Sequence, residues 1–159
     1  MSSWIIGVAA VAAQAAAAVH PPVIEAHLAS LVGDWTHAGK EATFRDNCVW
    51  YDRHRFVVCS LTDSVSGLRV EAIIGYSKDD ARFTYQSFSN DGGSHIQYGY
   101  ALGDRGMVFT DELKVGAKPT RVTTSLIPQP DRRLRMVQER SVMGGPWQQV
   151  GEVFYIPRK

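Results

Sequence analysis

From residue 33 onward, apolar and polar residues alternate along short segments that end at Gly, Pro, Asp or Asn. Between residues 68 and 77, for example, Val70 and Ile74 alternate with Arg69 and Glu71. This two-residue period predicts β-strands with one buried face. We expect ten strands, at roughly residues 33–38, 41–51, 55–62, 68–77, 81–89, 94–102, 106–115, 119–127, 132–142 and 147–156.

Only one segment shows a helical period. One face of a short helix that leads directly into the first strand is predicted by the spacing of Val23, Ile24, His27, Leu28 and Leu31. About ten antiparallel strands joined by short turns need their edges hidden, and closure into a barrel removes every edge. The sequence therefore predicts an all-β fold: an up-and-down antiparallel barrel of about ten strands with a short N-terminal helix, as a single domain over residues 23–159.

The two cysteines occupy one predicted hairpin, residues 48–59. A turn at Arg53-His54, or a longer loop with the same register, places Cys48 directly opposite Cys59. Opposed residues have Cβ atoms roughly 4.5–5.5 Å apart, which is close to disulfide geometry. We expect a structural disulfide. Two free thiols would be the outcome in a reducing compartment.

The N-terminus has the character of an export signal. Residues 4–18 form a run of small apolar residues, and the alanines at 15–18 provide a small-x-small cleavage pattern. The run lacks a Lys or Arg before it, and it is shorter than the roughly 20 residues of a spanning helix. We expect residues 1–18 to be a signal peptide and the protein to be periplasmic or secreted, without a membrane span.

The overall charge argues against a nucleic-acid partner. The net charge is +1, with 17 basic and 16 acidic residues. The local basic cluster at 131–135 follows Pro128 and Pro130, as expected of a solvated turn. An electrostatic nucleic-acid binder would carry a clustered basic excess.

Several segments together resemble a known architecture. They are the helix that runs into Gly33-Asp34-Trp35, the Cys48 and Cys59 strands, Ile74-Gly75-Tyr76 and the last strand from Trp147 to Arg158. Over about residues 26–159 the chain is similar to a bacterial family of exported calycin-like proteins, relatives of lipocalin and nitrobindin-like β-barrels. The resemblance implies that the Gly-x-Trp tryptophan, Trp35, closes one end of the barrel. It also implies that a basic residue at the chain end, Arg158 or Lys159, packs across that ring.

Nitrobindin-like barrels bind haem through a histidine near the C-terminal strands. This chain has no histidine after His95, so that ligand has no counterpart and no cofactor is expected. The five histidines form no metal-binding motif, and no Gly-x-Ser-x-Gly elbow is present. We therefore predict no catalytic residue and no metal site.

The residues expected inside the barrel define the candidate ligand site. Apolar walls with a few polar tips suit a small apolar or amphipathic ligand, and they equally suit a packed core. Glu152 is expected either inside, paired with Arg140 or Arg121, or at the solvent-facing rim. The candidate ligand-binding residues are Val70, Ile74, Tyr85, Tyr98, Tyr100, Phe109, Arg140 and Glu152.

Three functions follow from this interior. The first is an exported, non-enzymatic binding protein with a small ligand in the barrel. The second is a structural or protein-interaction module of the cell envelope with a filled barrel. The third is a lyase, isomerase or cyclase, which would need a carboxylate or tyrosine inside a solvent-connected cavity.

Overall fold

The computed structural model describes residues 21–51, 54–115 and 118–158. The predicted leader, residues 1–18, lies outside the described residues. The described chain is helix α1 (Pro21–Ala29) followed by ten antiparallel strands, which confirms the predicted fold class. The strands are β1 (Gly33–His37), β2 (Phe44–Tyr51), β3 (Phe56–Asp63), β4 (Leu68–Ser77), β5 (Arg82–Ser89), β6 (Ser94–Leu102), β7 (Gly106–Val115), β8 (Lys118–Pro128), β9 (Leu134–Val142) and β10 (Gln148–Pro157).

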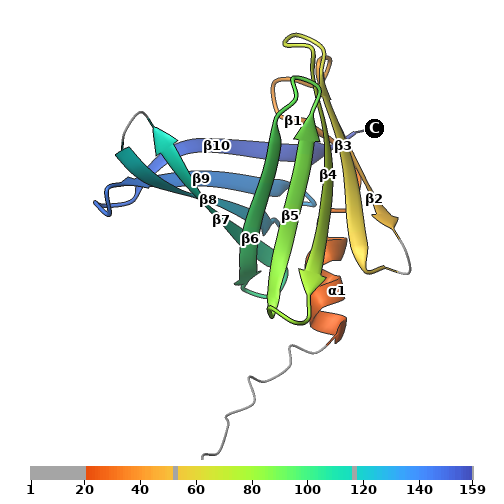
Figure 1. Cartoon of the computed structure of the whole chain (residues 1–159). Helices are drawn as coiled ribbons and strands as arrows, with labels where there is room; N and C mark the ends of the chain where they lie inside the picture. The colour runs from red at the N-terminus through yellow and green to blue at the C-terminus, as the bar shows by residue number, and fades with distance from the viewer. Residues whose placement is uncertain (1–20, 52–53, 116–117, 159) are drawn as a thin grey trace, which may run out of the picture.

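Each strand pairs with the next one in sequence, and β1 pairs with β10 to close the barrel. The closing register joins Trp35 to Pro157 and His37 to Tyr155. Figure 1 shows β4, β5 and β6 running upright while β8, β9 and β10 cross behind them. The sheet is therefore rolled strongly enough for its first and last strands to meet, and the ten described strands leave no open edge.

The cysteine hairpin has the predicted register. Cys48 lies opposite Cys59 and Tyr51 opposite Phe56, and the two sulfurs are bonded at 2.06 Å. Residues 52 and 53 of its turn lie outside the described residues. His54, just after them, has a positive φ of 63°, and its ring stacks on Trp50 with centroids 4.7 Å apart. These contacts support a turn that lacks the usual glycine.

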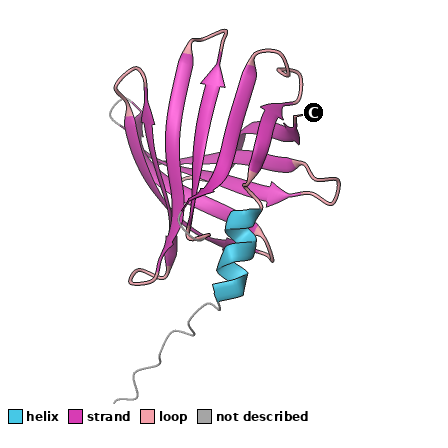
Figure 2. Cartoon of the chain, turned by 90° about the vertical axis from the view of Figure 1, so that its right-hand side faces the viewer, coloured by secondary structure: helices cyan, strands magenta, loops and turns pink. Residues whose placement is uncertain are grey.

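Helix α1 covers one end of the barrel (Figure 2). Its residues His27 and Leu28 are each only 1% exposed, and Leu31 just beyond it is 4% exposed. His27 holds the helix to the β6–β7 turn, because its Nε2 lies 3.1 Å from the Gly103 carbonyl oxygen. Its Nδ1 lies 2.6 Å from the carbonyl oxygen of Val23 in the same helix. Among the described residues, no helix has the length and apolar character needed to cross a membrane.

The core lies directly above this helix-covered end. Leu28, Leu31 and Trp35 pack there with inward residues of the strands, among them Val57, Ile74 and Phe83. Phe109, the largest fully buried side chain, lies over Gly99 of the neighbouring strand, where an added Cβ would come 2.6 Å from the ring. Space remains inside the barrel above these residues.

Candidate functional site

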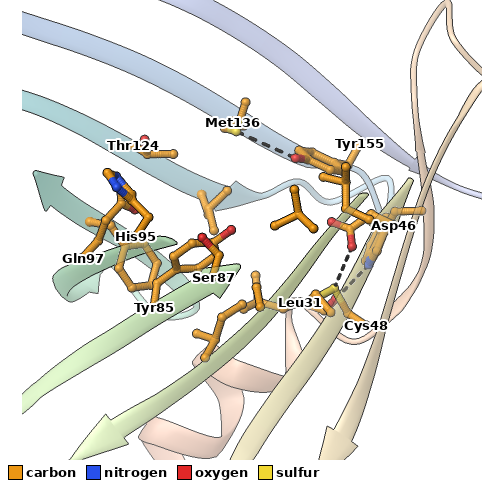
Figure 3. Close-up of a pocket in the computed structure, with 18 of the residues that line it drawn as sticks. Leu31, Asp46, Cys48, Tyr85, Ser87, His95, Gln97, Thr124, Met136 and Tyr155 are labelled. Carbon is orange, nitrogen blue, oxygen red and sulfur yellow. Dashed lines mark hydrogen bonds between the residues drawn. A yellow bond between two sulfur atoms is a disulfide. The ribbon is translucent and has the colours of Figure 1, made fainter. Parts of the chain in front are cut away.

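The barrel encloses a cavity of about 550 Å³. It reaches from Leu31 and Trp35 at the helix-covered end to Gly93 and Ser94 in the β5–β6 turn region, which are exposed to solvent. Its volume falls in the range typical of small-molecule sites, roughly 300–1,000 Å³. Figure 3 shows the lining side chains pointing into this space from strands on all sides.

The register explains how the strands build this wall. One row across the sheet joins Trp35, Asp46, Leu61, Val70 and Ser89 as successive cross-strand neighbours. All five line the cavity. The next row inward contains Cys48, Cys59, Ala72 and Ser87, which also line it. Because neighbours in a row share one face, the inner wall follows from the strand pairing.

Asp46 is the one acidic side chain among the described residues that line the cavity. It lies on β2 between Trp35 and Leu61, and its Oδ1 is 3.7 Å from the sulfur of Cys48. Burial raises the pKa of Asp46 to about 6, and the like charges of Asp34 and Glu71 add to the effect. A carboxyl with this pKa changes its charge close to neutral pH.

Two tyrosines add hydroxyl groups to the wall. Tyr155 of β10 donates its hydroxyl proton to the sulfur of Met136 at 3.9 Å, and Tyr85 of β5 stands edge-on to Phe109. Burial raises the pKa of both tyrosines, so both hydroxyls stay protonated at physiological pH. Their oxygens remain able to accept hydrogen bonds from a bound molecule.

A histidine and a carboxylate meet on the opposite side of the cavity from Asp46. Nε2 of His95 lies 2.5 Å from Oδ2 of Asp111, which makes no further hydrogen bond among the described residues. Figure 3 shows His95 with Gln97 and Thr124 on this side, and Asp46 with Tyr155 on the other. The cavity thus has two polar regions separated by apolar wall.

His37 lies next to the Asp46 side of the cavity without being part of its lining. Its ring stacks on Phe44 with centroids 3.6 Å apart and meets the edge of Tyr155 at 4.6 Å. Burial lowers its pKa below the ordinary value, so the ring is neutral at pH 7. His37 therefore supplies no positive charge to the cavity at neutral pH.

One group of potential metal ligands lies in the wall. Asp46, Cys48 and Cys59 offer ligand atoms within 4.8 Å of one another. The two sulfurs are bonded to each other, and it is the thiolate form of cysteine that binds metals. The oxidised hairpin thus has only one effective ligand, the carboxyl of Asp46.

The structure brings together four of the predicted ligand-site residues. Val70, Ile74, Tyr85 and Phe109 all line the cavity. Ile74 and Phe109 are 3% and 1% exposed, so they form its inner wall. Val70 lies farther along β4, towards the β5–β6 turn.

The prediction that Tyr98 and Tyr100 line the interior is wrong. Both point outwards and are 42% and 57% exposed. The inward positions of β6 belong to His95, Gln97 and Gly99. The physical reason is the bulk of Phe109, which fills the space that a side chain at position 99 would need. Tyr98 instead lies beneath the guanidinium of Arg82, 3.7 Å from the ring centroid.

Arg140 and Glu152 also lie outside the cavity lining, contrary to expectation. Glu152 is on the outer face of β10 and pairs with Arg135, with Nε and Oε1 2.5 Å apart. Arg121, the other predicted partner, pairs instead with Glu112. Arg140 is exposed near the end of β9, beyond Gln138, which does line the cavity. Glu152 was misplaced because a strand's alternation separates its two faces without saying which face is inside. Arg140, by contrast, is on the same face as Gln138 but lies past the cavity at the exposed strand end.

Trp35 lies at the helix-covered end of the barrel. It is 8% exposed, and its indole Nε1 donates a hydrogen bond to the Leu31 carbonyl at 2.7 Å. The backbone N–H of Arg158 donates to the Asp34 carbonyl at 2.8 Å, and Arg158 and Trp35 line the same outer hollow. Lys159 lies outside the described residues.

Sequence reasoning missed the polar residues of the cavity. No sequence motif marks the polar side chains of the wall, which are Asp46, Ser87, Tyr155 and His95 with its partner Asp111. A signal for Asp46 was nevertheless present, because it is two residues before Cys48 and so shares the inward face of the disulfide. No protein-family model matches the chain, and no curated protein matches it in sequence.

Proposed function

We propose that this chain is an exported, non-enzymatic binding protein that holds a small apolar or amphipathic ligand inside its barrel. The observation that carries the proposal is the cavity of about 550 Å³, lined mainly by apolar side chains with a few polar groups. A filled barrel of this architecture would leave no such space. Membership of the exported calycin-like proteins is part of the same proposal.

Two observations support export. The disulfide between Cys48 and Cys59 persists outside the reducing cytoplasm, and the alanine-rich residues 4–18 have the composition of a signal peptide. Expression with a periplasmic fractionation assay tests this part. Recovery of the mature chain beginning near residue 19 in the periplasm or medium is expected, and retention of full-length protein in the cytoplasm would contradict export.

Ligand binding is tested with N-phenyl-1-naphthylamine, a fluorescent probe that is uncharged at neutral pH. We expect saturable binding at one site, with displacement by apolar competitors. Val70→Trp places a large ring in the cavity and should abolish binding. Ile96→Trp is the matched control, because it changes a β-branched residue that is 54% exposed on the outer face. Equal loss in both variants, or no saturable binding by the parent protein, would defeat the proposal.

A second candidate is an enzyme that transfers a proton within the cavity. Asp46, with a pKa raised to about 6, is the observation that favours it, since general acids and bases work best near the operating pH. Mass spectrometry of ligand released after prolonged incubation separates the two functions. A binding protein returns its ligand unchanged, whereas an enzyme returns a product.

The envelope interaction module is favoured by a different surface. Ile96, Tyr98 and Tyr100 are successive outward residues of β6 and form, with Phe88 of β5, an exposed apolar strip on the outer face. Strips of this kind often mark protein interaction sites. Loss of a partner on Tyr100→Ser, with probe binding unchanged, would favour this module over the ligand-binding role.

A further inference from the structure

If the cavity holds a ligand, as the proposed binding function states, the position of Asp46 in its wall bears on the chemical class of that ligand. The cross-strand neighbours of Asp46 on the inner face are Trp35 and Leu61, both apolar, and Figure 3 shows its carboxyl pointing into the cavity. Among the described residues, the carboxyl oxygens of Asp46 have one polar contact, with the disulfide sulfur of Cys48, which carries no proton.

The part of the chain that the structure describes supplies no cation to this carboxyl. Among the described residues that line the cavity there is no lysine and no arginine. Arg45, the neighbour of Asp46 in sequence, points outwards and pairs with Asp34, with Nε and Oδ1 2.9 Å apart. His95, the one histidine in the lining, is held by Asp111 on the opposite side.

The remaining ionisable groups around Asp46 do not neutralise its charge either. Asp34 on β1 and Glu71 on β4 are like charges that oppose its ionisation. His37 on β1 is neutral at pH 7, and the hydroxyls of Tyr85 and Tyr155 stay protonated. A half-buried carboxylate without a partner is costly, and a cation brought by a ligand would offset that cost.

We propose that the ligand is an amphipathic amine whose cationic nitrogen binds the carboxylate of Asp46 and whose apolar body lies along the cavity wall. An ammonium has three donors, so it can bond the carboxylate and also the hydroxyl oxygen of a nearby tyrosine. Tyr155 is on the same side of the cavity as Asp46 (Figure 3). Leu61, Leu68 and Val70 provide an apolar path from Asp46 towards the open end.

Three ligands with the same twelve-carbon chain test this inference. Dodecylamine, dodecanol and dodecanoate each compete with N-phenyl-1-naphthylamine at pH 7.5, below their micelle concentrations. We expect dodecylamine to displace the probe at a concentration about tenfold or more below that of dodecanol, the size expected of a charge-assisted hydrogen bond. Dodecanoate should be the weakest, because two carboxylates would meet in the wall.

Asp46→Asn keeps the shape of the side chain and removes its charge. We expect it to reduce amine affinity to that of the alcohol and to leave alcohol affinity unchanged. Asp79→Asn is the matched control, since Asp79 is exposed in the β4–β5 turn, and it should retain the preference for the amine. Asp46→Ser replaces the asparagine variant if that variant does not fold.

The pH profile gives an independent readout. The amine stays protonated between pH 5 and 7.5, while the carboxyl of Asp46, with a pKa of about 6, loses its charge as the pH falls. Amine affinity should therefore drop about tenfold from pH 7.5 to pH 5, in proportion to the ionised fraction. In Asp46→Asn the profile should be flat, because the charge that binds the amine is gone.

The outcomes distinguish this inference from the binding function on which it rests. Equal displacement by all three ligands, with no effect of Asp46→Asn, would overturn the amine and leave cavity binding intact. A preference for the amine that survives Asp46→Asn would also overturn it. Failure of the probe and of all three ligands to bind would defeat the binding function itself.

Discussion

Oδ1 of Asp46 lies 3.7 Å from the sulfur of Cys48, two residues farther along the inward face of β2. The strand that is tied covalently to β3 thus also carries the acidic group of the cavity. The disulfide joins directly opposed residues and holds the two strands in register, so the carboxyl has a rigid support. This combination, a fixed wall with a polar group of raised pKa, is typical of functional rather than purely structural interiors.

Asp46 should make the stability of the protein depend on pH. Its pKa is raised from 3.8 to about 6 on folding, so between these values the folded state binds more protons than the unfolded state. The contribution of Asp46 to the free energy of unfolding is therefore most favourable at low pH and is lost as the pH rises through about 6. Asp46→Asn should raise the free energy of unfolding at pH 8 by up to about 3 kcal/mol and change it little at pH 4.

Chemical denaturation at both pH values measures this difference, with Asp79→Asn as the control that changes stability by less than about 0.5 kcal/mol. If Asp46→Asn instead lowers the free energy of unfolding at pH 8, the Asp46 carboxylate has favourable interactions in the folded protein that outweigh the cost of its burial.

The disulfide should stabilise the fold mainly by restricting the unfolded chain. Its loop spans a sequence separation of 11 residues, for which chain entropy predicts about 3 kcal/mol. Cys48→Ala with Cys59→Ala should lower the free energy of unfolding by about this amount. Thiol titration of the unfolded, unreduced parent protein should find no free cysteine, and two reactive thiols in exported material would contradict the assignment.

His27 should contribute to closure of the helix-covered end. Replacement by leucine keeps the bulk and removes both contacts with the carbonyls of Val23 and Gly103. We expect a loss of about 1–3 kcal/mol and faster amide exchange in α1, because a buried carbonyl without a partner is costly. Ser30→Ala removes the hydroxyl hydrogen bonds to the carbonyls of His27 and Arg105, and it should have a smaller effect because Ser30 is less buried than His27. Unchanged exchange in α1 would mean that apolar packing alone holds the helix.

The strand order and the cysteine register were predictable because both depend on local pattern. Each expected strand coincides with an observed one, and the pairing of Cys48 with Cys59 follows from counting along one hairpin. About ten strands joined by short turns then predict that the sheet closes into a barrel, because closure hides both edge strands. These features need no knowledge of contacts between distant strands.

The inward face of β6 was not predictable in this way. Tyr98 and Tyr100 are apolar enough for a core, and alternation alone favours them as inward residues. What places them outside is the ring of Phe109 on the next strand, which needs a residue without a side chain at position 99. The outward position of Glu152 was unpredictable for the same reason. Tyr155 points inwards and meets His37, and a residue three positions away on the same strand lies on the opposite face. Which side chains fit against one another on neighbouring strands depends on the tertiary structure, so the pattern within a single strand does not reveal it.

Gly33 and Trp35 should be energetically coupled, which would give the Gly-x-Trp pattern a physical reason. A Cβ at position 33 would lie 2.9 Å from Cε2 of the Trp35 indole, too close for the ring to keep its place and its hydrogen bond to Leu31. Gly33→Ala should therefore cost about 1–3 kcal/mol and shift the tryptophan fluorescence. In a Trp35→Leu background, which has no indole to displace, the same substitution should cost less than in the parent, with only the cost of the Gly33 backbone (φ 159°) remaining. The double-mutant cycle is measured by urea denaturation, and equal penalties in both backgrounds would show that the glycine is needed for its backbone and not for the ring.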